Sequence, residues 1–177
     1  KGVVGMNTKE EDFVEHLFIA STHDYLLFFS NNGRCYWLKV YEVPQAGRAA
    51  RGKAVVNVLN LSSGEKITAV LPVRKFEPDR YVFMATKNGT IKKTELTAFS
   101  RPRAGGIIAL GLDAGDELIG VGQTDGSREI FIGTQLGKAV RFPEAAVRPM
   151  GRTARGVRGI GLAKGDSVVG MEIVSSG

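Results

Sequence analysis

The chain has few of the residues that build catalytic and metal sites. Its 177 residues include a single cysteine, Cys35, which excludes an internal disulfide and argues against a cysteine-based zinc site. One free thiol suits a reducing compartment, and we expect a cytoplasmic location. His16 and His23 lack a cluster of neighbouring ligands, so ordinary surface or turn roles are expected for both. We find no nucleophile–base pair, P-loop or acidic metal cluster, and we predict no catalytic residue, no metal and no cofactor.

Long apolar runs and helical periodicity are also missing. No stretch has the length of a membrane span or the pattern of a signal peptide, so no membrane partner is expected. One short helical turn at Glu144-Ala-Ala-Val147 is the most that the periodicity allows. Hydrophobic residues nevertheless make up 43% of the chain and charged residues 24%, which is typical of a folded globular protein.

Positive charge is what the chain has in excess. The formal net charge is +6, which favours an anionic partner. Between Lys138 and Lys164 there are seven basic residues and one acidic residue, Glu144. The densest part is Arg148-Pro-Met-Gly-Arg-Thr-Ala-Arg-Gly-Val-Arg-Gly159, in which glycines free the backbone to approach a ligand closely. Guanidinium groups match phosphate oxygens in geometry, so a phosphate backbone is the natural partner.

This basic, glycine-rich segment recurs. Gly47-Arg-Ala-Ala-Arg-Gly52 is nearly identical to Gly151-Arg-Thr-Ala-Arg-Gly156, and Ser100-Arg-Pro-Arg-Ala-Gly-Gly106 is a looser copy. A turn glycine precedes each copy, at Gly33, Gly89 and Gly137, and a strand-like run begins eight residues before each of these glycines. At the first turn, Asn31-Asn-Gly33 favours a type I′ hairpin. A fixed period of this length indicates a propeller or a solenoid.

The repeats predict an all-β fold. We place them at about residues 3–61, 62–112 and 113–162, with the start of a further one at 163–177. The expected strands cover residues 16–22, 25–29, 34–39, 66–73, 81–86, 90–95, 117–124, 129–134, 138–142 and 167–174. Three to four short strands in roughly 50 residues describe the four-stranded blade of a β-propeller. About three blades fall short of the four or more that close a ring, so we expect one partial domain with an incomplete ring.

At these residues the chain resembles the C-terminal domain of the A subunit of bacterial DNA gyrase. The most specific stretches are residues 11–24, Asn32-Gly-Arg34 and Arg48-Ala-Ala-Arg-Gly52. The resemblance implies a β-pinwheel, a propeller variant whose neighbouring blades exchange strands. The hallmark of that family is the box Gln-Arg-Arg-Gly-Gly-Lys/Arg-Gly, and only Lys1-Gly2 matches its last two residues. The related domain of topoisomerase IV, which lacks a proper box, therefore stays a close alternative.

The resemblance also implies a function. Double-stranded DNA would wrap around the basic rim of the wheel without sequence-specific reading, and the wrap would support negative supercoiling. The partners would be DNA and the remaining parts of gyrase, both its B subunit and the rest of its A subunit. The domain would be a non-catalytic part of an ATP-dependent type II topoisomerase. The candidate DNA contacts are Lys1, Arg34, Lys39, Arg48, Arg51, Lys53, Lys92, Lys93, Arg101, Arg103, Lys138, Arg141, Arg148, Arg152, Arg155 and Arg158.

Two further hypotheses concern protein partners. A protein-interaction propeller would use an apolar patch on one face of the wheel and would not need arginine loops. Self-association is the second, because three blades leave strand edges unpaired. In that hypothesis residues 167–174 form a half-built blade, and two copies close one wheel by exchanging terminal strands.

Overall fold

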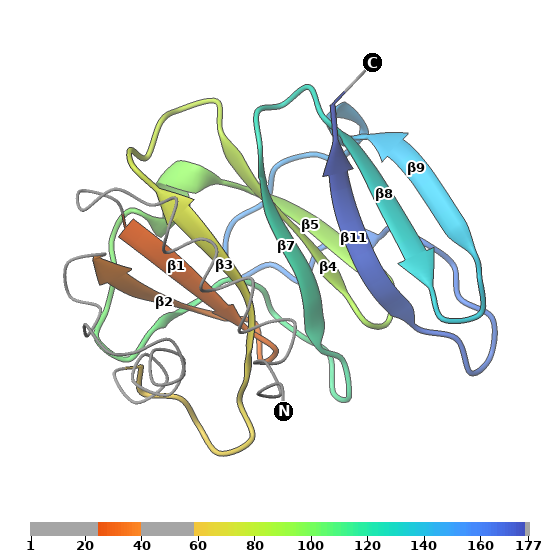
Figure 1. Ribbon diagram of the computed structural model, residues 1–177, viewed down its shortest axis with the longest axis horizontal. Coiled ribbons are helices and arrows are strands. Elements are labelled where there is room, and N and C mark those ends of the chain that lie inside the picture. Colours follow the sequence, from red (N-terminus) through yellow and green to blue (C-terminus); the bar gives the residue numbers. More distant parts are fainter. Residues whose placement is uncertain (1–24, 40–58, 176–177) are drawn as a thin grey trace, which may run out of the picture.

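A computed structural model describes residues 25–39 and 59–175 and consists almost entirely of strands (Figure 1). The predictions for Lys1, Arg48, Arg51, Lys53, the two histidines and the strand at residues 16–22 lie outside the described residues. The strands are β1 Tyr25–Ser30, β2 Arg34–Lys39, β3 Ile67–Val73, β4 Tyr81–Thr86, β5 Thr90–Glu95, β6 Ile107–Ile108, β7 Leu118–Thr124, β8 Glu129–Thr134, β9 Ala139–Pro143, β10 Val157–Arg158 and β11 Val168–Val174. Two 3₁₀ turns, η2 Leu96–Phe99 and η3 Glu144–Ala146, follow β5 and β9.

Each repeat contributes one antiparallel hairpin, made of β1–β2, β4–β5 or β8–β9. The turn glycines Gly33, Gly89 and Gly137 have φ values of 79°, 93° and 91°. The expected type I′ turn is wrong, because it needs a positive φ at the residue before the glycine as well, and Asp79 is the one non-glycine residue with positive φ in the described ranges. Gly33 instead donates its N–H to the Ser30 carbonyl at 3.0 Å, which closes a three-residue loop that ends in a left-handed glycine.

The sheets combine strands from different repeats. The strand orders are β3-β1-β2-β6 in the first sheet, β10-β5-β4-β7 in the second sheet and β11-β8-β9 in the third sheet. Each hairpin therefore takes its inner strand from the start of the following repeat. Strands β2 and β5 take their outer strands, β6 and β10, from the segments after the basic loop of the following repeat. This is the strand exchange that the resemblance implied. It corrects the half-built blade expected at residues 167–174, because β11 pairs with β8 and completes the inner side of the third sheet.

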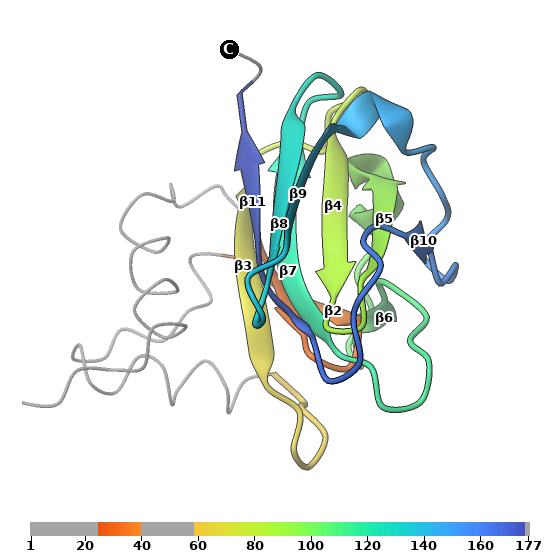
Figure 2. The ribbon, with the colours of Figure 1, turned by 90° about the vertical axis from the view of Figure 1, so that its right-hand side faces the viewer.

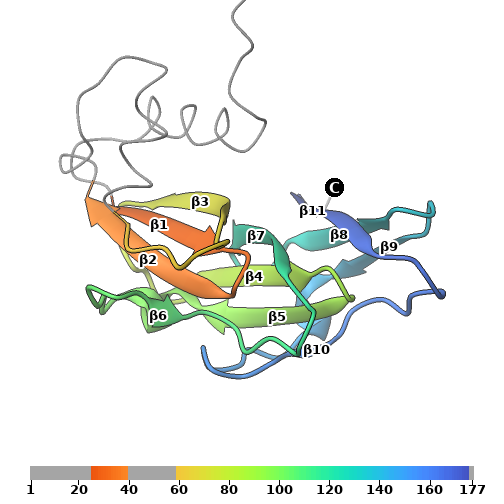
Figure 3. The same cartoon turned by 90° about the horizontal axis from the view of Figure 1, so that it is seen from below.

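The three sheets stand side by side as an arc, without a closed ring among the described residues (Figures 1 and 3). Strands β3, β7 and β11 lie next to one another on the inner side. Two glycines of β7 allow this closeness, because a Cβ on Gly120 would lie 2.9 Å from the Met171 Cβ and a Cβ on Gly122 would lie 2.1 Å from the Ile173 Cδ1. Strands β6 and β10 lie on the opposite, outer side (Figures 2 and 3).

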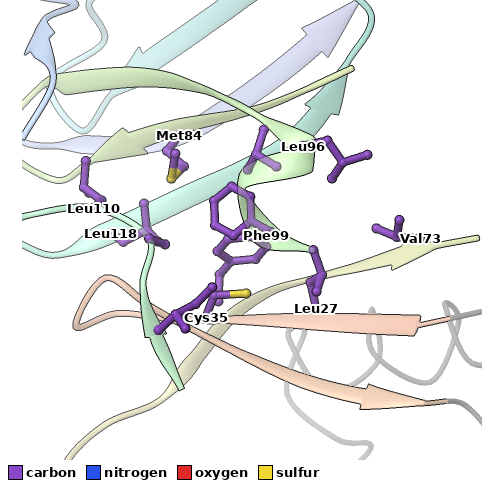
Figure 4. Packing of buried hydrophobic residues seen from close by; sticks show 12 residues of the cluster. Leu27, Cys35, Val73, Met84, Leu96, Phe99, Leu110 and Leu118 are labelled. Carbon is purple, nitrogen blue, oxygen red and sulfur yellow. The ribbon is translucent and has the colours of Figure 1, made fainter. Parts of the chain in front are cut away.

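Apolar side chains pack in the space between neighbouring sheets. Leu27 and Phe29 of β1 meet Met84 of β4, with Phe99 of η2 filling the space (Figure 4). Phe83 on the other face of β4 packs with Ile130 and Ile132 of β8. Strand β4 is buried on both faces because alternate side chains pack toward the first and the third sheet. In β1, Leu26 and Phe28 pack instead with Leu59 and with side chains of their own sheet. Phe131 occupies in the third sheet the place of Leu27 and Phe83, yet it is 39% exposed.

Candidate nucleic-acid interface

The two described basic segments run along the outer side and end in the outermost strands. We call residues 100–106 the second basic loop and residues 148–156 the third basic loop; they lead into β6 and β10 respectively. Arg101 and Arg103 of the second loop are exposed, as are Arg148 and Arg155 of the third and Arg158 of β10. The predicted loop arginines therefore gather on one side of the arc, on two consecutive sheets.

The backbone of the second sheet fixes both ends of the third basic loop. The Met150 N–H donates to the Lys93 carbonyl at 2.7 Å, and Val157 and Arg158 pair with Ile91 and Thr90 of β5. The residues between these anchors bulge over β5. The loop is therefore a supported element of the fold, held at each end by backbone hydrogen bonds.

Lys92 fills the space beneath this bulge. Its Nζ atom donates to the carbonyl oxygens of Gly151, Arg152 and Ala154 at 2.9, 2.6 and 3.0 Å. Burial, and to a smaller degree the Arg152 charge, lower the pKa of Lys92 to about 8. The prediction that Lys92 contacts DNA needs correction, because its side chain is fully buried and its three donors already have partners.

Gly156 allows the loop to pass so close to β5. Its φ of 97° lies in the left-handed region, and a Cβ at this position would lie 2.3 Å from the Ile91 carbonyl oxygen. Gly106 has the same role in the second basic loop, where φ is 82° and a Cβ would lie 2.7 Å from the Tyr36 ring. Gly106 and Gly156 are thus required by a close backbone approach rather than by flexibility, whereas a Cβ on Gly105 or Gly151 would meet no atom within 4 Å.

Lys93 also points inward, so its predicted DNA contact is corrected as well. Its Nζ atom donates to the Glu144 carbonyl at 3.0 Å, lies 3.8 Å from the Glu144 carboxylate and stands 4.8 Å from the centre of the Tyr81 ring. Glu144 is itself buried and accepts hydrogen bonds from the Thr124 hydroxyl and the Arg128 N–H. This polar cluster links the second sheet to η3 and leaves no route from Lys93 to a phosphate.

Two arginines of the third loop reach across to the outer segment that follows the second loop. The Arg152 Nη1 atom donates to the Ile108 carbonyl at 2.9 Å, and Arg155 forms an ion pair with Asp113. Both side chains of that pair are largely exposed, at 71% and 64%. Arg152 is half-buried, whereas Arg155 is exposed.

Arg34 supports the second basic loop from β2. Its Nη2 atom donates to the Gly105 carbonyl at 2.9 Å, and it is half-buried. Beside it, the Tyr36 hydroxyl donates to Glu65 at 2.8 Å. Burial, followed by this hydrogen bond to Glu65, raises the pKa of Tyr36 to about 12. The arrangement matches that of Lys92, since each basic loop crosses a side chain of the hairpin in the preceding sheet.

Three other candidates lie along β2, β9 and the turn before β9. Lys138 is exposed and its ammonium donates to the Gly161 carbonyl. Arg141 on β9 is 54% exposed and pairs with Glu129 at 2.5 Å. The Lys39 ammonium lies 5.7 Å from the centre of the Tyr25 ring.

Trp37 packs inside the fold, and the described residues form no metal-ligand cluster. Trp37 stacks on Phe76 with ring centres 5.3 Å apart and donates its indole N–H to the Phe99 carbonyl, which fits the predicted packing role. Within residues 25–39 and 59–175, no group of three or more histidine, cysteine, aspartate or glutamate residues is placed to hold a metal ion. In the same residues, no helix is long and apolar enough to cross a membrane.

Sequence reasoning missed the inward roles of Lys92 and Lys93, although a signal was present. Adjacent residues of a strand point to opposite faces, so two neighbouring lysines in a strand that is covered on both sides cannot both reach solvent. It also missed Asp113 and Glu144 as partners. Both lie far in the chain from the basic residues that they contact, and no local pattern reveals them.

Comparison with known proteins identifies the family. The family model described as "DNA gyrase C-terminal domain, beta-propeller" matches residues 1–21, 24–74, 80–125 and 128–175. The A subunit of DNA gyrase from Salmonella typhimurium is 57% identical over 98% of the chain, and that from Haemophilus influenzae is 58% identical over 92%. The chain spans about a fifth of these relatives, 20% and 18% of their lengths.

Solved structures agree with the family match. A C-terminal domain of DNA topoisomerase IV is 33% identical with a TM-score of 0.80, and the match covers 88% of this chain and 48% of that one. A DNA gyrase A C-terminal domain is 26% identical with a TM-score of 0.70, covering 86% of this chain and 48% of that one. The family match over most of the sequence, together with these relatives, shows that the chain belongs to the DNA gyrase C-terminal domain family.

Proposed function

We propose that the outer side of this domain binds double-stranded DNA without sequence specificity and wraps it. The supporting observation is the gathering of exposed arginines from two consecutive basic loops, Arg101 and Arg103 on one and Arg148 and Arg155 on the next. Guanidinium groups bind phosphate oxygens in a bidentate manner, and a series of phosphate contacts offsets the energy of bending the duplex. Contacts of this kind position DNA but carry no base information.

In the whole enzyme we propose that this wrap supports negative supercoiling by DNA gyrase. The domain would supply no catalytic group and would act in the cytoplasm with the B subunit of gyrase, as well as with the rest of the A subunit. The curated relatives support gyrase, because two gyrase A subunits are 57% and 58% identical to this chain. Among the solved structures the order is reversed, with the topoisomerase IV domain 33% identical and the gyrase A domain 26% identical.

Binding measured over a range of salt concentrations tests the proposal. If four or five arginines contact phosphate, the plot of log affinity against log salt should have a slope of about −4, from about −0.9 for each contact. Two duplexes of equal length and unrelated sequence should bind alike. Weak binding that does not change with salt, or a strong preference for one sequence, would contradict the proposal.

A further inference from the structure

Lys92 is a buried cation that is bound entirely by the loop above it. Its side chain has 0% exposure, and all three hydrogen bonds of its ammonium go to carbonyl oxygens of residues 151, 152 and 154. In the part of the chain that the structure describes, no acidic residue forms an ion pair with it. The charge beneath the third basic loop is therefore satisfied by hydrogen bonds but not neutralised.

The sheet itself does not require a lysine at this place. Lys92 lies three residues after its turn glycine, where the first and third hairpins carry Tyr36 and Val140. Burying an ammonium costs free energy through lost hydration, so an uncharged residue would serve packing at least as well. The reason for a lysine here lies in the third basic loop, whose carbonyl groups its three N–H donors bind and to whose positive potential its charge adds.

The three hydrogen bonds direct the carbonyl groups of residues 151, 152 and 154 toward Lys92. With its carbonyl oxygens directed at Lys92, the loop has Arg148 and Arg155 exposed on its surface, followed by exposed Arg158 on β10. A positive charge just below the surface, screened less than an exposed one, adds to the potential that attracts phosphate.

We propose that Lys92 is a positioning residue for DNA binding, which holds the third basic loop from beneath so that its arginines meet the phosphates. The inference rests on the proposed function. Lys92 itself touches no DNA in this arrangement. Its contribution is to keep an arginine-rich loop in a single conformation despite the repulsion between the arginine side chains. The loop therefore loses less conformational entropy when DNA binds.

The test compares Lys92→Met with Lys87→Met, which removes the same charge from an exposed lysine in the β4–β5 turn. A duplex of about four helical turns is the probe. We expect Lys92→Met to weaken binding about fivefold or more, whereas Lys87→Met should change affinity by less than about twofold. In Lys92→Met the slope of log affinity against log salt should also become less steep by more than about 0.9, the value for one phosphate contact. Hydrogen exchange without DNA should speed up at residues 150–157 in Lys92→Met while β4 and β8 stay protected.

Equal affinities and slopes for the two variants would overturn the proposal. If Lys92→Met does not fold, Lys92→Tyr replaces it, because Tyr36 shows that the equivalent site accepts this ring; Lys92→Tyr with the affinity of the natural sequence would also overturn it. Absence of DNA binding by the natural sequence would contradict the proposed function instead. The exchange measurement needs no DNA and still decides whether Lys92 holds the loop.

Discussion

Replacing Gly156 by alanine should detach the third basic loop from the second sheet. Two costs add up: about 1–2 kcal/mol for a residue with a side chain in the left-handed region, and about 1–2 kcal/mol for the steric conflict. The conflict is severe because the new Cβ would lie 2.3 Å from the Ile91 carbonyl oxygen and 3.1 Å from the Lys92 Cβ. The Ile91 backbone pairs with both β4 and β10, so it cannot move aside. We expect a loss of about 2–4 kcal/mol from the free energy of unfolding.

Urea denaturation followed by fluorescence of Trp37 measures this loss, and a duplex titration measures the accompanying fall in affinity. Gly151→Ala is the control in the same loop, because its Cβ would have no atom within 4 Å and its φ is not positive. That control should stay within about 0.5 kcal/mol of the natural sequence. Gly156→Ala with a stability equal to that of the control would show that the loop does not cross Lys92 as described.

Four other predictions rest on the same contacts, and a fifth concerns self-association. Asp113→Asn frees Arg155 and should strengthen DNA binding by about two- to fivefold at low salt, while the control Asp79→Asn, with the same charge change, should leave affinity unchanged. Arg152→Ala combined with Arg155→Ala should reduce DNA affinity modestly with little change in the urea midpoint. If the double variant binds DNA as tightly as the natural sequence, the third basic loop does not lie on the DNA path. Between pH 7 and 9, affinity should fall as Lys92, with its pKa of about 8, loses its proton, and it should stay flat in Lys92→Met. The contribution of Lys92 to stability should change in the opposite direction: its folded pKa lies below the ordinary 10.5, so the unfolded chain binds more protons from about pH 8 to 10.5 and stability rises with pH in that window. Sedimentation of the 177-residue chain tests self-association, and a strict monomer across the micromolar range contradicts the closed dimer.

The hairpins could be predicted from the sequence because their signals are local. The alternating strands around Gly33, Gly89 and Gly137 pair with their immediate neighbours in the chain, so a repeat of turn and strand is sufficient. The 3₁₀ turn at residues 144–146 followed from a short helical pattern, whereas η2 carried no signal that separated it from the end of β5.

The membership of the sheets could not be predicted in the same way. Strand β3 follows a loop and could pair with either the hairpin before it or the one after it, and the residues of β3 are compatible with both. Strands β6 and β10 have two residues each, too few to show alternation. The basic loops were recognised from their composition, but which lysines face solvent depends on partners such as Glu144 and the loop carbonyls, which the fold brings together from distant positions.

The exchange of strands has a consequence for how the chain reaches its structure. All four strands of the second sheet are present only when residues 81–158 have been assembled, and the hairpin of the third sheet lies within that stretch. Completing the second sheet therefore requires chain from both sides of the third hairpin, unlike a solenoid, in which each repeat contacts only its neighbours. We expect the sheets to unfold together, and a cut at Leu112 would deprive the β4–β5 hairpin of both its flanking strands. We expect a pair of adjacent sheets to be the cooperative unit of unfolding.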